Sequence, residues 1–100
     1  MKHITELSEI PTSGKVIIDF FATWCGPCKR IAPIFVELSE KFSSITFLKC
    51  DVDEAEEVSQ KYSVESLPTF ILLNNGVIHG SVEGANLGGL IQAIERMEKM

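Results

Sequence analysis

The segment Trp24-Cys25-Gly26-Pro27-Cys28 constrains this chain more than any other. It lies between an apolar run over residues 16–21, typical of a buried strand, and residues 31–42, where apolar side chains recur at helical spacing. Two residues three positions apart on the first turn of a helix have Cβ atoms within about 5–6 Å, close to disulfide geometry. The free N–H groups and partial positive charge of a helix N-terminus also favour a thiolate. The pattern predicts a dithiol redox site at a strand-to-helix junction.

Apolar runs that predict strands alternate with segments of helical periodicity. Strands are expected over residues 15–21, 45–50, 69–73 and 77–82, and Asn74-Asn75-Gly76 predicts a hairpin turn between the last two. Helices are expected after the cysteines, over residues 53–62 and 87–97, and in a short turn near residues 7–10. Asp53 with Glu56 resembles a capping box, and Asn86 is the expected cap of the last helix. This order predicts one α/β domain, residues 1–100, with a mixed sheet flanked by helices on both faces.

Composition and charge exclude several classes of function. The chain has 100 residues, of which 45% are hydrophobic, enough for the core of a single domain. The net charge is −5; residues 1–50 carry six Lys/Arg against five Asp/Glu, and residues 51–100 carry three against nine. A nucleic-acid partner is not expected because there is no basic footprint. No run approaches the ~18 consecutive apolar residues of a membrane span, so no membrane association is expected.

The cysteine count bears on both compartment and metal binding. Three cysteines are too few, and odd in number, for the disulfide framework of a secreted protein, and residues 1–6 lack the apolar stretch of a signal peptide. A reducing, cytoplasmic location is therefore expected. Half of a zinc site is the alternative interpretation of the cysteine pair, but Cys50, His3 and His79 stand singly, without metal-like spacing, so no metal is expected. Cys50 is expected to be a buried, inert thiol and the two histidines to lie at the surface.

The chain resembles the thioredoxin family over nearly all of its length. The resemblance rests on Asp19-Phe20-Phe21-Ala22, Trp24-Cys25-Gly26-Pro27-Cys28-Lys29, Ile31-Ala32-Pro33, Asp51-Val52-Asp53, Leu67-Pro68-Thr69-Phe70 and Gly84-Ala85. Phe21 departs from it, because many thioredoxins have a second tryptophan there. The resemblance implies the thioredoxin fold and a general protein-disulfide reductase that works by thiol–disulfide exchange.

The two cysteines are expected to have different roles. Cys25, at the exposed tip of the helix, is the expected nucleophile, and Cys28, one turn inward, the thiol that resolves the mixed disulfide. Gly26 permits close approach of a substrate backbone, and Pro27 is tolerated in a first turn because its missing N–H has no helical partner there. Pro27 argues against an oxidase or isomerase of the same fold, since such relatives usually place a histidine there. The intact cysteines disfavour a redox-inert binding module.

Asp19 is the expected proton acceptor and donor. It lies inside an apolar run, so burial is expected to raise the pKa of its carboxyl group, and a nearby thiol could then pass its proton to it. A surface aspartate that merely ends the strand is disfavoured because apolar residues continue past it. By resemblance, Lys49 lies near Asp19 and tunes its charge.

The resemblance also implies a substrate-binding rim around the dithiol, made of Trp24, Val52, Leu67, Pro68, Gly84 and Ala85. Pro68 matches a proline whose cis peptide bond faces the cysteines, although the sequence alone favours a trans bond at the start of a strand. The backbone of Leu67 would then be free to pair with an extended substrate. Ordinary packing stays an equal alternative for Val52 and Ala85.

No cofactor is expected to be bound, because the chain has neither a G-x-G-x-x-G fingerprint nor a P-loop. By resemblance, electrons come from NADPH through thioredoxin reductase. The expected partners are that reductase and disulfide-containing proteins such as peroxiredoxins, with the chain itself a monomer.

Overall fold

The computed structural model describes residues 1–100 and is built on a five-stranded sheet in the order β1-β3-β2-β4-β5. The strands are β1 Lys2–His3, β2 Lys15–Phe21, β3 Thr46–Asp51, β4 Thr69–Asn74 and β5 Val77–Glu83. β2 is central; β3 runs parallel to it on one side and β4 antiparallel on the other. The sheet is mixed, and the predicted α/β fold is confirmed.

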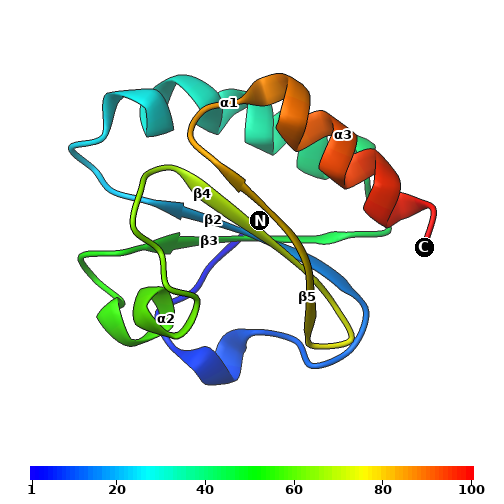
Figure 1. The fold of residues 1–100 in the computed structure, drawn as a ribbon, viewed down its shortest axis with the longest axis horizontal. Helices are drawn as coiled ribbons and strands as arrows, with labels where there is room; N and C mark the ends of the chain where they lie inside the picture. Colours follow the sequence, from blue (N-terminus) through cyan, green and yellow to red (C-terminus); the bar gives the residue numbers. More distant parts are fainter.

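The helices form a layer on each face of the sheet (Figure 1). The helices α1 Gly26–Lys41 and α3 Leu87–Glu98 cover one face, while α2 Glu56–Lys61 and a short 3-10 helix, Leu7–Glu9, lie on the other. Two apolar clusters follow this division. One joins Phe35 of α1 and Ile94 of α3 to the sheet, and the other joins Val58 of α2 and Ile4 to the opposite face.

β2 is buried on both faces, and the alternation of its side chains between the two faces of the sheet determines where Asp19 points. Successive strand side chains point to opposite faces. Ile17 belongs to the cluster under α1, whereas Ile18 and Phe20 belong to the cluster under α2. Asp19 is two residues beyond Ile17, so its carboxyl group lies on the α1 face.

Two predicted turn and cap features are confirmed. Asn75 and Gly76 join β4 to β5 with φ values of +52° and +81°, the left-handed conformation that a two-residue hairpin turn requires. Asn86 is the N-cap of α3, and its Oδ1 accepts a hydrogen bond from the backbone N–H of Gly89 at 3.0 Å. α3 begins directly after this cap.

Other details differ from the sequence predictions. The capping box at Asp53 and Glu56 is wrong: Ala55 is the N-cap of α2, which ends at Lys61 and has no side-chain cap hydrogen bond. The Asp53 carboxylate is instead bonded to Trp24, a partner 29 positions away. β1 was not predicted, because a two-residue strand leaves no periodic pattern. None of the helices combines the length and the apolar character needed to cross a membrane.

Candidate active site

Segments from one edge of the sheet surround the two cysteines. β2, β3 and β5 end at this edge and β4 begins there, because β4 runs antiparallel to its two neighbours. Residues 22–25 connect β2 to α1 and carry Cys25 to the helix N-terminus. The fold thereby places a helix end, three strand ends and the start of a fourth strand around one point.

Cys25 and Cys28 form a disulfide at the start of α1, with Cα atoms 5.3 Å apart. Cys25 is the N-cap residue, and its Sγ accepts a hydrogen bond from the backbone N–H of Cys28 at 3.2 Å. Pro27 lies in the first turn, where it removes no helical hydrogen bond. The hydrogen bond and the helix terminus both favour negative charge on Cys25 once the disulfide is reduced.

Burial does not distinguish the two sulfur-bearing residues. Cys25 and Cys28 are each 5% exposed, so the expectation that Cys25 is the exposed one is wrong for this disulfide state. The reason is local packing: Phe21, Val52 and Leu67 lie against the pair. Access to the sulfur atoms therefore depends on the residues of the rim.

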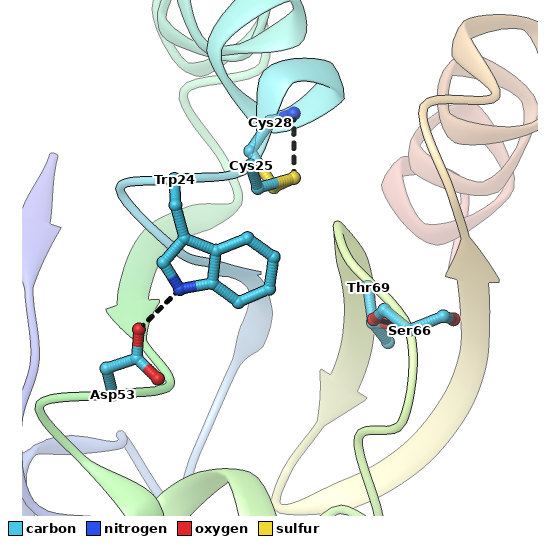
Figure 2. Close-up of a disulfide and its surroundings, with 6 residues drawn as sticks. All are labelled: Trp24, Cys25, Cys28, Asp53, Ser66 and Thr69. Atoms are coloured by element: carbon cyan, nitrogen blue, oxygen red, sulfur yellow. Dashed lines mark hydrogen bonds between the residues drawn. A yellow bond between two sulfur atoms is a disulfide. The ribbon is translucent and has the colours of Figure 1, made fainter.

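The predicted cis peptide bond between Leu67 and Pro68 is present. The carbonyl oxygen of Pro68 accepts a hydrogen bond from the N–H of Gly84 at 2.7 Å, which ties the start of β4 to the end of β5. The hydroxyl of Thr69 donates to the carbonyl oxygen of Ser66 at 2.6 Å and braces the turn, opposite Trp24 in Figure 2. No backbone hydrogen bond involves Leu67, so its N–H and C=O are free to pair with another chain.

Trp24 is the exposed apolar side chain beside the disulfide, with 69% of its surface accessible. Its indole N–H donates a hydrogen bond to Oδ2 of Asp53 at 2.8 Å, as Figure 2 shows. The N–H of Asp53 in turn donates to Oδ1 of Asp51 at 2.9 Å. Asp53 was not predicted as a site residue. The only sequence feature that could have indicated its role is the motif Asp51-Val52-Asp53. The spacing to Glu56 instead made Asp53 resemble a helix cap.

Asp19 is buried on the α1 face of β2, with 5% of its surface exposed. Burial raises the pKa of its carboxyl group from 3.8 to about 7, while the charge of Lys49 acts in the opposite direction. One carboxyl oxygen, Oδ1, has no hydrogen-bond partner. Asp19, Cys28 and Lys49 line the same cavity of about 280 Å³, so the acid and the inner cysteine share one space.

The remaining polar candidates, Lys49, Cys50 and the two histidines, lie as expected. Lys49 pairs with Asp19 in the register of β2 and β3, so the expected proximity is confirmed. Cys50 is a free thiol with 0% exposure, and burial is the main cause that raises its pKa to about 11. His3 and His79 are exposed as expected. No group of three or more His, Cys, Asp or Glu side chains is arranged to hold a metal ion.

Comparison with known proteins agrees with this geometry. The family model described as thioredoxin matches residues 3–96. The chain belongs to the thioredoxin family. Thioredoxin 1 of Plasmodium falciparum (isolate 3D7) is 49% identical over 100 residues, covering 96% of each chain. A thioredoxin H-type of Oryza sativa subsp. indica is 47% identical over 90 residues, covering 89% of this chain and 74% of the relative.

The solved structures agree as well. The structure of Plasmodium falciparum thioredoxin superposes with a TM-score of 0.91 at 43% identity and covers 96% of this chain and 98% of that one. Thioredoxins are dithiol oxidoreductases that carry no resident cofactor, and this chain is a dithiol oxidoreductase with its C-x-x-C pair at Cys25 and Cys28. Of the expected rim, Val52 and Leu67 pack against the small cluster formed by Ala22 and the two cysteines. Pro68 is buried, the N–H of Gly84 donates to its carbonyl oxygen, and Ala85 is exposed.

Proposed function

We propose that this chain is a monomeric, cytoplasmic protein-disulfide reductase of broad specificity, formed by a single domain over residues 1–100. The observation that carries the proposal is the cavity that Asp19 shares with Cys28, the inner residue of the disulfide at the start of α1. A cysteine pair with a buried proton acceptor beside it can reduce a substrate disulfide, and then be reduced again, at neutral pH. With its Cys25–Cys28 disulfide, the structure corresponds to the oxidised protein, after two electrons have passed to a substrate.

Cys25 acts as the nucleophile in the first step. Its thiolate attacks one sulfur of a substrate disulfide, the substrate S–S bond breaks, and the other substrate sulfur leaves as a thiolate. Support comes from the hydrogen bond that the N–H of Cys28 donates to Cys25 Sγ, which stabilises the thiolate form. Gly26, directly after Cys25, is exposed and lets a substrate backbone approach.

Cys28 resolves the mixed disulfide in the second step. Its thiolate attacks Sγ of Cys25, the Cys25–Cys28 disulfide forms, and the second substrate sulfur leaves, so that two electrons have moved from the dithiol to the substrate. The carboxylate of Asp19 accepts the proton that Cys28 releases. The pKa of about 7 suits this exchange, since an acceptor works best when its pKa is near the working pH.

The substrate lies against the rim of the dithiol. The free backbone groups of Leu67 pair with an extended segment of the substrate, and the exposed indole of Trp24 contacts its apolar side chains. This rim favours broad specificity, because main-chain pairing carries little sequence information. Val52, Pro68, Gly84 and Ala85 complete it.

The oxidised protein has to be reduced again, and we assign this step to thioredoxin reductase with NADPH as the two-electron donor. Disulfide-bonded proteins such as peroxiredoxins are the proposed substrates. A solved yeast neighbour, with a TM-score of 0.91, is described in a study of thiol resolution in a mitochondrial 1-Cys peroxiredoxin through glutathione and thioredoxin systems. That description supports, by analogy, the same substrate class for this chain.

The insulin-reduction assay tests the proposal. With dithiothreitol as donor, the protein should accelerate the precipitation of reduced insulin, and Cys25→Ser should abolish that activity. Cys50→Ser is the matched control and should retain it, because Cys50 lies in the core away from the dithiol. Activity retained by Cys25→Ser would reject the assigned nucleophile. A strongly oxidising potential of the dithiol would instead make the chain an oxidase or isomerase.

A further inference from the structure

The ammonium of Lys49 lacks the partner that would be expected for it. Lys49 and Asp19 are register partners on adjacent parallel strands, and both line the same cavity. Nevertheless the two ion pairs of the structure are Lys2–Glu9 and His3–Glu54, and Oδ1 of Asp19 has no hydrogen-bond partner. The ammonium thus acts on the carboxylate through space without being bonded to it.

The ammonium lies over an aromatic ring. Nζ of Lys49 lies 5.9 Å from the centroid of Phe21, within the range of a cation–π interaction. Phe21 is half-buried at the end of β2 and lines the same cavity as Asp19, on the same face of the strand. Its ring also lies against the ring of His3 on β1, with centroids 5.7 Å apart.

We propose that Phe21 is a positioning residue for the proposed proton acceptor, because its ring keeps the Lys49 ammonium beside the cavity and so tunes the Asp19 carboxylate. A half-buried lysine without an ionic partner is otherwise free to extend its ammonium into water. Without the ring the ammonium moves away, and the carboxylate loses the favourable charge that now stabilises its ionised form. This inference rests on the proposed role of Asp19, but it is tested by titration of the Asp19 carboxyl group itself.

The other titratable groups around this site are few. On the cavity itself they are Cys28 and Lys29 of α1, and near Phe21 they are His3, Glu54 and Asp51. β4 contributes only the apolar ring of Phe70 opposite Asp19. Cys28 does not titrate in the oxidised protein, so this state isolates the carboxyl group.

The experiment follows the NMR chemical shift of the Asp19 side-chain carboxyl carbon as a function of pH in oxidised, 13C-labelled protein. The pKa of Asp19 should be higher in Phe21→Leu than in the parent, and the increase should not exceed that in Lys49→Met. Phe21→Trp should titrate like the parent, since an indole also binds a cation. Phe21→Met gives a second variant that fills the space without a π face.

The double variant separates the charge from packing. In a Lys49→Met background, Phe21→Leu should produce no further increase, because the ammonium that the ring positions is gone. An unchanged or lower Asp19 pKa in Phe21→Leu overturns the proposal, and so does an increase that persists in the Lys49→Met background. The measurement needs no turnover, so a failed reductase assay with the expected titrations would reject the proposed function alone.

Discussion

Cys25 and Cys28 are equally buried, so their different roles follow from their positions on α1 and not from exposure. Cys25 caps the helix and accepts a hydrogen bond, whereas Cys28 lies one turn inside and shares the cavity of Asp19. Cys28→Ser should therefore trap mixed disulfides, because nothing resolves the bond that Cys25 forms. Mass spectrometry of the variant mixed with disulfide-bonded proteins should show covalent adducts at Cys25.

The reciprocal variant is the control. Cys25→Ser should give few adducts at Cys28, because that residue is held inside the first turn. Adducts at Cys28 in a yield equal to that of the first variant would mean that the order of the two thiols is reversed.

Asp53 should determine the position of Trp24. Asp53→Ala removes the acceptor of the indole N–H and should raise KM for protein disulfides by roughly two- to tenfold, the range expected for one lost hydrogen bond. Trp24 is the single tryptophan, so its fluorescence reports the change directly. Asp53→Asn keeps an acceptor oxygen and should resemble the parent. Identical emission from Asp53→Ala and the parent would show that the bond does not hold the ring.

At the scale of single elements, α3 allows a test of one cap. Asn86→Ala should lower the free energy of unfolding by about 1 kcal/mol, because the N–H of Gly89 loses its acceptor. Asn86→Ser supplies another oxygen and should recover most of the loss. Denaturant unfolding of the oxidised proteins measures both, and an Asn86→Ala variant as stable as the parent would contradict the assigned cap.

Elements with strong local signals were predictable from the sequence. The apolar run of β2, the helical period of α1 and α3, the Asn75-Gly76 turn and the Asn86 cap each depend on neighbours within a few positions. Local hydrogen bonding and apolar periodicity decide such features, and both can be read from spacing. The order of these elements was then sufficient to predict the mixed sheet.

The incorrect or missing predictions concern contacts between distant segments. Asp53 has the spacing of a helix cap, but its carboxylate bonds to Trp24 across the active site. Val52 and Leu67, which belong to other loops, pack against the cluster that contains the buried Cys25. Lys49 was placed near Asp19 only by family resemblance, since its position in β3 carries no local signal for the strand register. The site depends on contacts that only the folded chain creates.

At the scale of the whole molecule, the alkylation rate of Cys50 measures how often the domain unfolds. It lies on β3 in the core, fully buried, and burial raises the pKa of its thiol to about 11. Alkylation should therefore require unfolding and be at least roughly a thousandfold slower than in denaturant, given the usual stability of small domains. A Cys25→Ser/Cys28→Ser double variant leaves Cys50 as the only thiol, and rapid labelling in that native variant would show that β3 opens locally.

Asp19 should make the stability of the whole domain depend on pH. Its folded pKa is about 7 and its unfolded pKa about 3.9, so between these values the folded state binds more protons than the unfolded state. The free energy of unfolding should therefore fall as pH rises from about 4 to about 7, and stay low above that range. The accumulated loss is on the order of 4 kcal/mol, since each pKa unit corresponds to about 1.4 kcal/mol.

Asp19→Asn removes this dependence, because an amide does not titrate while it resembles the protonated carboxyl group in shape. Near pH 4 the free energy of unfolding of the variant should be similar to that of the parent. As pH rises to about 7 the variant should become more stable than the parent, and the difference should stay constant above that pH. It should also resolve mixed disulfides more slowly, because Cys28 loses its proton acceptor. Denaturant unfolding of both oxidised proteins across this range measures the difference. A difference that does not vary with pH would mean that Asp19 is solvated in the folded protein, and its role as proton acceptor would be rejected with it.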